Sequence, residues 1–307
     1  MVVYASSVAG PAVVPSGVRL EGRATAPASL VALAGAESNG AGGAAGTSGA
    51  GGAGGSSAPP ALVTLGVGSV LAGFALDGKG AAAGVRAEAG ALRLEGPLTV
   101  TNTTRAVDLG GTADATVAGT QAAPVLVKGN QLGIVVGPTA SLALTGDGEK
   151  GGVTVEGTTA GAGVLVLAGE VGPAVRLEGL RAKDNKVGTV DGTGAVEVRQ
   201  GRSVTIKNGV FEGNRQAVTL NGELTSGFTS FTNVVLEGNR FTLATPGQGS
   251  TICGSQLGNQ TQLRLGPGNV FPLAATNCPP AQAGSCNTGA DVGYDTANQF
   301  AITCTGS

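Results

Sequence analysis

The amino-acid sequence predicts an all-β fold of the solenoid type, in which short strands wind into successive coils of about 22 residues. Three observations predict it: apolar segments alternate with polar residues and end at Gly, Asn or Asp; the segments recur at a regular spacing; and the composition is rich in Gly. The 307 residues include 56 Gly and 14 Pro but only 7 Phe, 2 Tyr and no Trp. This composition argues against the thick helix–sheet layers of an α/β enzyme.

The expected strands are three to five residues long, and within them apolar and polar side chains alternate. A period of two indicates a β-strand, and each segment stops at a residue that favours a turn. Helical spacing is not sustained, because Gly interrupts nearly every window rich in Ala. Typical segments are Val18–Gly22, Leu92–Gly96, Val153–Gly157, Val175–Gly179 and Val218–Gly222.

The spacing of the segments indicates how they are arranged. Segments begin at Val153, Val175, Val196 and Val218, which gives a nearly constant interval of roughly 22 residues. A fixed period of this size is typical of a solenoid, in which each repeat buries its apolar face against neighbouring repeats. Since the glycines exclude long helices, the repeats are expected to be strands.

A ten-residue motif occurs twice in the second half of the chain. Residues Ile206–Arg215 and Phe231–Arg240 are identical at six of ten positions, four of which form Glu-Gly-Asn-Arg. Asn accepts the left-handed backbone of a sharp turn, and its amide can bond to the Asn of the next coil, so we expect a ladder of stacked side chains. Ordinary Gly-Asn turns without a ladder are the alternative. The expected ladder comprises Asn130, Asn185, Asn214 and Asn239.

The segments Ser203–Asn214 and Leu71–Gly78 resemble coils of the right-handed parallel β-helix repeat family, the pectin-lyase-like superfold. The resemblance covers roughly residues 62–271 and implies a single-stranded right-handed parallel β-helix. It implies little about activity, because the repeat reports backbone geometry. The superfold includes pectate lyases, polygalacturonases, phage tailspikes, adhesins and scaffolds without catalytic activity.

The chain is expected to divide into four parts. Residues 1–33 form the first coils and an N-terminal cap region, and residues 34–60 form a flexible loop, because they are rich in Gly and Ala and lack apolar side chains that could offset the entropy of ordering. Residues 61–272 form the β-helix itself. Residues 273–307 form a C-terminal cap pinned by disulfides, which covers the strand edges of the last coil.

The four cysteines Cys253, Cys278, Cys286 and Cys304 all lie near the C-terminus. Their even number and late clustering predict two disulfides, and therefore an oxidising, extracytoplasmic location. We expect Cys278 to pair with Cys286 and Cys253 with Cys304, although the sequence leaves all three pairings open. Four unpaired thiols and a zinc site are the alternatives, and the absence of a Cys-x-x-Cys pair argues against zinc.

Several classes of function are excluded or disfavoured. The absence of His excludes catalysis and metal binding by imidazole, and the net charge of −2 argues against a nucleic-acid-binding surface. No apolar run approaches the ~18 residues of a transmembrane segment. Aspartates are mostly scattered, without the Asp-Asp pair of polygalacturonases or the acidic spacing of a calcium loop, so neither a metal nor another cofactor is expected. The partner classes that remain are polysaccharides, cell-envelope components and further copies of the chain.

The candidate catalytic residues are Glu212, Glu237, Arg215 and Arg240, which occupy matching positions of the ten-residue motif. Both Glu are therefore expected to stack on one coil edge, with both Arg beside them. Such a group could act as an acid–base or sugar-acid-binding site, or it could be an ion network that relieves stacking of like charges. We favour the second interpretation. The sequence thus predicts a secreted or cell-surface structural or adhesive module without catalysis, the alternatives being a polysaccharide-processing enzyme and a subunit of an envelope or fibre assembly.

Overall fold

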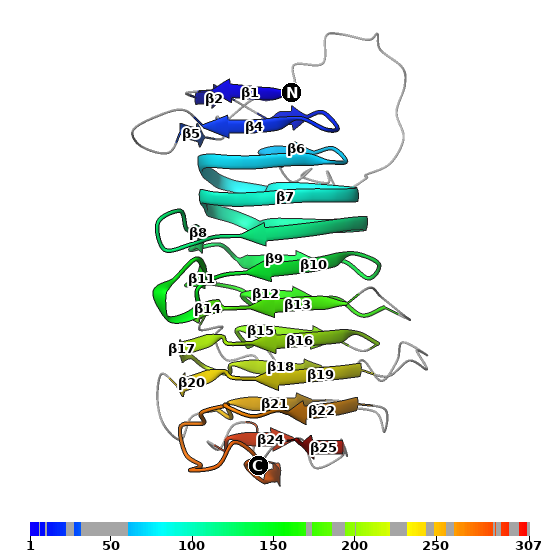
Figure 1. Ribbon diagram of the computed structural model, residues 1–307, viewed down its shortest axis with the longest axis vertical. Helices are drawn as coiled ribbons and strands as arrows, with labels where there is room; N and C mark the ends of the chain where they lie inside the picture. Colours follow the sequence, from blue (N-terminus) through cyan, green and yellow to red (C-terminus); the bar gives the residue numbers. More distant parts are fainter. Residues whose placement is uncertain are drawn as a thin grey trace, which may run out of the picture.

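The computed structural model shows a stack of coils along one long axis, with the N-terminus at one end and the C-terminus at the other (Figure 1). Within the described residues the strands belong to one sheet that winds around this axis, and the printed pairings between them are parallel. The predicted fold class, an all-β parallel β-helix, is confirmed. The structure describes residues 1–5, 7–9, 11–22, 28–31, 61–169, 174–185, 194–199, 201–221, 232–243, 249–255, 261–284, 286, 290–294 and 301–305.

Each coil contributes strands to three faces, which we call A, B and C in the order in which the chain visits them. Face A comprises β1 (Val2–Ala5), β4 (Arg19–Gly22), β10 (Ser141–Thr145), β13 (Val175–Glu178), β16 (Ser203–Lys207), β19 (Thr232–Glu237), β22 (Thr261–Leu265) and β25 (Ala301–Cys304). Face B comprises β2 (Ser7–Ala9), β5 (Ala28–Val31), β8 (Val125–Lys128), β11 (Val153–Glu156), β14 (Leu180–Lys183), β17 (Val210–Asn214) and β20 (Arg240–Leu243).

Face C comprises β3 (Ala12–Val14), β6 (Val63–Leu65), β9 (Leu132–Val136), β12 (Val164–Val166), β15 (Val196–Arg199), β18 (Val218–Asn221), β21 (Ile252–Ser255), β24 (Val292–Tyr294) and β23 (Ala281–Ala283). The long strand β7 (Ser69–Ala118) continues around corners and contributes to all three faces. A 3₁₀ turn, η1 (Gly148–Lys150), stands between β10 and β11.

The coil length varies, and most coils are longer than expected. The expected length holds where Val63 pairs with Val85 and where Val196 pairs with Val218. Elsewhere more chain separates the register partners, as it does between Leu142 and Val175. The regular interval between the segments that begin at Val153 and Val175 joins face B to face A of the next coil, because strands on all three faces carry the same alternating pattern. An interval of two strands along the chain therefore resembles, in the sequence, the repeat of one complete coil.

The interior of the coils is filled by stacked apolar side chains, mainly Val, Leu and Ala. Parallel register places equivalent residues above one another, so Phe211, Phe241 and Phe271 form a stack with ring centroids 5.2 and 5.1 Å apart. Aromatic stacking at this distance adds to the stabilisation from apolar burial. The core is thus built by repetition along the axis.

The C-terminal residues continue the solenoid. Strand β24 pairs in parallel with β21, and β25 pairs with β22, so the tail adds part of a further coil. Both predicted disulfides form, but the expected pairing is wrong: Cys253 bonds to Cys286, and Cys278 to Cys304. The expectation rested on short sequence separation, whereas the winding of the tail brings more distant cysteines to Cα–Cα distances of 5.1 and 5.9 Å. The loop predicted at residues 34–60 lies outside the described residues.

Candidate functional site

The predicted residue Glu212 lies on the outer side of face B between two arginines. Its carboxylate lies 2.8 Å from Nη2 of Arg181 and 3.7 Å from Nη2 of Arg240. The register explains this arrangement, because Arg181 and Arg240 occupy the same column of face B, one coil on either side of Val210. The structure therefore brings Glu212 and Arg240 together, and it adds Arg181, which the motif did not indicate.

The other two predicted residues lie elsewhere. Glu237 is on face A, where its carboxylate lies 2.6 Å from Nζ of Lys207, so it does not stack on Glu212. Aligning the two copies of the motif compares the end of a face-B strand with the end of a face-A strand, because both corners use the same Glu-Gly-Asn turn. Arg215 follows β17, whereas Arg240 begins β20, so the two arginines lie at opposite ends of face B.

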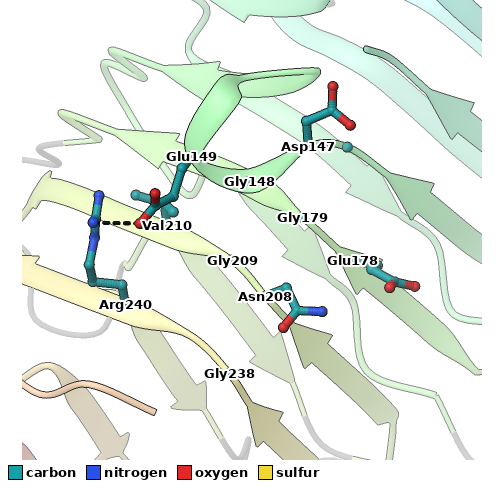
Figure 2. Close-up of a pocket in the computed structure, with 11 residues that line it drawn as sticks. Asp147, Gly148, Glu149, Glu178, Gly179, Asn208, Gly209, Val210, Gly238 and Arg240 are labelled. Atoms are coloured by element: carbon teal, nitrogen blue, oxygen red, sulfur yellow. Dashed lines mark hydrogen bonds and ion pairs between the residues drawn. The ribbon is translucent and has the colours of Figure 1, made fainter. Parts of the chain in front are cut away.

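A hollow of about 380 Å³ lies at the corner between faces A and B, below the loop that carries η1. The N–H of Gly148 donates to the carbonyl of Gly179 at 2.9 Å, and Oε1 of Glu149 lies 2.5 Å from Nη1 of Arg240. The loop thus reaches across several coils, and Figure 2 shows Glu149 extended to Arg240 beside Val210. Positive φ angles of 56° at Gly148 and 102° at Gly151 let the chain make this excursion.

The floor of the hollow is largely backbone of the corner turns, including Gly179, Gly209 and Gly238. The acidic side chains at its rim already have partners or lie apart: Oδ2 of Asp147 accepts the N–H of Gln121 at 2.8 Å, and Figure 2 shows Glu178 away from the Glu149–Arg240 pair. Among the described residues, no group of three or more His, Cys, Asp or Glu is arranged to hold a metal ion. The site can donate and accept hydrogen bonds along a shallow surface.

Charged side chains on the outer sides of faces A and B alternate in sign from coil to coil. On face B the register stacks Lys128, Glu156, Lys183 and Glu212 in one column, and the Lys128–Glu156 pair is 3.0 Å apart. On face A the column reads Glu178, Lys207 and Glu237. Adjacent coils are only ~4.8 Å apart, so like charges in one column would repel each other. Because the charges alternate in sign, neighbouring side chains in a column attract each other instead.

The expected Asn ladder exists in part and is divided between two corners. At the corner after face B, the side chain of Asn185 donates to Oδ1 of Asn214 at 3.0 Å, and Oδ1 of Asn130 accepts the N–H of Thr103 at 3.0 Å. Asn239 belongs to the corner after face A, where it bonds to Asn269 at 3.1 Å. The amide of each Asn also reaches a carbonyl of the coil before it, as Asn185 does with Val155.

The left-handed backbone at these turns belongs to the residue before the Asn. Gly129, Gly213 and Gly238 have φ angles of 62°, 64° and 66°, and Asp184 adopts 52° in the same position. The ladder residue itself points inward and is buried, as at Asn185 and Asn214. The turn chemistry expected of Asn is therefore shared between two adjacent residues.

Two further polar groups were not indicated by any motif. Asp108 lies between two arginines of face C, 3.1 Å from Nη2 of Arg86 and 2.9 Å from Nη1 of Arg105. Arg202 is fully buried and donates to the carbonyls of Gly137 and Ala140, both at 2.7 Å. Burial lowers the pKa of the Arg202 guanidinium below its usual value. A charge this far from water has no signature in a single sequence.

No protein-family model, curated protein or solved structure matches the chain. Among the described residues, no helix has the length and apolar character needed to cross a membrane. The function is therefore argued from the fold and from the geometry of the outer faces.

Proposed function

We propose that the protein is a secreted or cell-surface structural and adhesive module, a β-helix of the pectin-lyase-like kind that works without catalysis. The observation that carries the proposal is the alternating charge of the columns on faces A and B. Ion pairs join successive coils at Lys128–Glu156 and Lys207–Glu237, and Glu212, one of the two predicted acidic residues, lies between Arg181 and Arg240. Groups used in this way stiffen a rod and present a shallow polar surface to a partner.

The two disulfides support the extracytoplasmic location. They join Cys253 to Cys286 and Cys278 to Cys304, and such bonds persist in oxidising compartments. A stiff rod with a covalently fixed C-terminal end suits a protein exposed outside the cell. Polysaccharides and cell-envelope components are the partners that a shallow surface of paired charges and hydroxyl groups would contact.

The test is to incubate the purified chain with a panel of neutral and acidic cell-wall polysaccharides. The proposal expects co-sedimentation with one or more insoluble polysaccharides and no new reducing ends or unsaturated products. Cleavage that is abolished in Glu212→Gln and retained in Glu237→Gln would overturn the proposal in favour of a polysaccharide-processing enzyme at the face-B cluster. The Glu237 variant is the matched control, because its ion pair lies on the other face.

Assembly into a fibre is a second candidate, favoured by the first coil. Among the described residues, β1 pairs with β4 alone and β3 with β6 alone. In these strands Val2 and Val13 are 46% and 74% exposed. Open parallel edges are templates for a further strand. Light scattering over a range of concentrations tests this candidate: growth in mass that is lost in Val13→Lys supports it, and a constant monomer mass excludes it.

A further inference from the structure

A small hollow of about 220 Å³ lies at the C-terminal end of the solenoid, away from the polar corner described above. It is lined by five apolar residues and by the polar residues Gln282 and Asp291, which come from two stretches of chain, residues 273–282 and residues 290–291. Leu273 stands at its margin and is 55% exposed. The remaining apolar wall residues are Ala274, Pro279, Pro280 and Ala290.

One titratable side chain lines this hollow. Asp291 is 5% exposed, and its Oδ1 accepts the N–H of Leu273 at 3.2 Å. Burial raises the pKa of the Asp291 carboxyl, and hydrogen bonds from the backbone of Leu273 and Ala274 and from the side chain of Thr251 oppose that effect. Within the described part of the chain, no Lys or Arg contributes to this shift. A buried carboxylate is rarely left without a compensating charge, because its desolvation is costly.

We propose that this hollow binds a primary ammonium group carried on an apolar chain, the chemistry of a lysine side chain. The carboxylate of Asp291 would accept hydrogen bonds from the ammonium, and Leu273, Pro279 and Pro280 would contact the methylene groups. A pocket with apolar walls and one placed charge is the usual form of a small-ligand site. The site lies at a distance from the faces invoked in the proposed function and does not depend on it.

The two disulfides hold the walls of this hollow in place. Cys278, which is bonded to Cys304, directly precedes Pro279. Cys286, which is bonded to Cys253, lies shortly before Ala290 and Asp291. Walls that are fixed before the ligand arrives reduce the entropic cost of binding. Reduction of both disulfides in the folded chain should therefore weaken binding several-fold.

The experiment is an NMR titration of the full, oxidised chain with the N-methylamide of Nα-acetyl-lysine. We expect saturable shifts of the amides of Leu273, Ala274 and Asp291. The norleucine analogue has the same chain without the charge and should bind at least tenfold more weakly. Binding should tighten as pH rises through the raised pKa of Asp291, because the ligand pairs with the ionised carboxylate. Equal binding of both analogues, or binding that does not depend on pH, would overturn the proposal.

A pair of variants locates the site. Asp291→Asn keeps an acceptor for the N–H of Leu273 but removes the charge, and it should weaken binding at least tenfold. Asp114→Asn, which changes an exposed carboxylate on face A, should leave binding unchanged. If Asp291→Asn disorders the cap, seen as collapse of the β24 and β25 amide signals, the comparison of lysine with norleucine on the unmodified chain decides. Unchanged binding in a folded Asp291→Asn variant would overturn the proposal.

A further arm identifies the source of the ammonium group. Binding of n-butylamine as tight as that of the lysine derivative would assign the site to free alkylamines. Tighter binding of the lysine derivative would assign it to a lysine presented by another polypeptide. Both results support the ammonium chemistry, and failure of both ligands would contradict it while leaving the proposed structural role intact.

Discussion

The β-helix of residues 61–272, which we call the wall, and the C-terminal cap of residues 273–307 are stabilised by different interactions. In the wall, many side chains contact the same residue type in the next coil. Phe211 stacks on Phe241, and the side chain of Asn185 donates a hydrogen bond to Asn214. In the cap, the contacts are not repeated from coil to coil. Examples are the disulfide between Cys253 and Cys286 and the hydrogen bond from the N–H of Leu273 to Asp291. Repetition supplies stability to the wall, and disulfides add to the strand pairing that holds the cap.

This difference explains where ionisable groups can be buried. In the wall, buried or half-buried charges have defined partners, as Arg202 has the carbonyls of Gly137 and Ala140. In the cap, the buried carboxyl of Asp291 accepts the N–H of Leu273 and also lies beside the apolar residues that line a hollow. We therefore expect the wall to unfold cooperatively as one unit, and the cap to unfold locally without the wall.

The largest expected effect is from Arg202→Met. Removing the guanidinium leaves buried carbonyls without donors, so we expect a loss of about 3–5 kcal/mol in the free energy of unfolding. Denaturant titration followed by circular dichroism measures it. The control is Arg93→Met, which removes an arginine with a 58% exposed side chain paired to Glu95 and should cost less than about 1 kcal/mol. Similar losses in both variants would contradict the structural role assigned to Arg202.

Disulfide removal should separate the cap from the wall. The bonded cysteines are 33 and 26 residues apart, and loop entropy predicts a contribution of about 3–4 kcal/mol for each bond. In Cys253→Ser/Cys286→Ser we expect hydrogen exchange to accelerate in β24 and β25 while β13 and β16 stay protected. Cys278→Ser/Cys304→Ser should affect mainly β25. Equal acceleration throughout the wall would show that cap and wall unfold together.

Ladder substitutions test whether the two corners are equivalent. Asn185→Ala removes a donor to Val155 and an acceptor for the N–H of Thr158, so we expect a loss of about 2–3 kcal/mol. Asn239→Ala should cost a similar amount, since Asn239 makes the corresponding bonds to Ile206 and Gly209. Thr154→Ala on the outer side of face B is the control, expected to change stability by less than about 0.5 kcal/mol. Thermal unfolding monitors all three variants.

Charge reversal in a column should have a smaller effect that depends on salt. Glu156→Lys would place a third positive charge between Lys128 and Lys183, at an expected cost of about 1 kcal/mol at low ionic strength. High salt should remove most of that cost by screening. Glu156→Gln is the matched control, because it removes the attraction without adding repulsion. A cost that is independent of salt would point to packing instead of charge.

The smallest expected effect is the pH response of the cap. Burial raises the pKa of Asp291 in the folded state, so this group favours the folded cap in acid and loses that contribution as pH rises through its folded pKa. Asp291→Asn should therefore stabilise β24 at neutral pH and leave it unchanged in acid. Hydrogen exchange of Val292 and Gly293 as a function of pH, compared between the two proteins, measures this. A larger gain in acid than at neutral pH would reverse the assigned sign.

Most of the wall could be predicted from the sequence. Alternating segments such as Val153–Gly157 indicated the strands, and the Gly-Asn pairs indicated the turns, because both depend on local backbone preference. The length of a coil was harder to predict. Strands on different faces carry the same alternation of apolar and polar residues. The interval from Val153 to Val175 could therefore be interpreted either as two successive strands or as one complete coil.

The candidate site was predicted only in part. Glu212 and Arg240 were singled out by a shared motif, and they do lie together, but for a different reason than the alignment suggested. Their proximity comes from the column that Arg181, Val210 and Arg240 share on face B. Glu149 could not be associated with Arg240 in advance, since 91 residues separate them and only the loop around η1 brings them together.

By itself the sequence determined the class of fold, the presence of two disulfides and the use of Asn at the turns, since each follows from local propensity or composition. The tertiary structure alone decided which face each strand occupies, which cysteines pair, which charges alternate in a column and where a carboxylate is buried in the cap. These features depend on the lengths of the corner turns. Turn lengths differ from coil to coil while the columns stay in register, so the spacing along the chain does not tell which residues become neighbours.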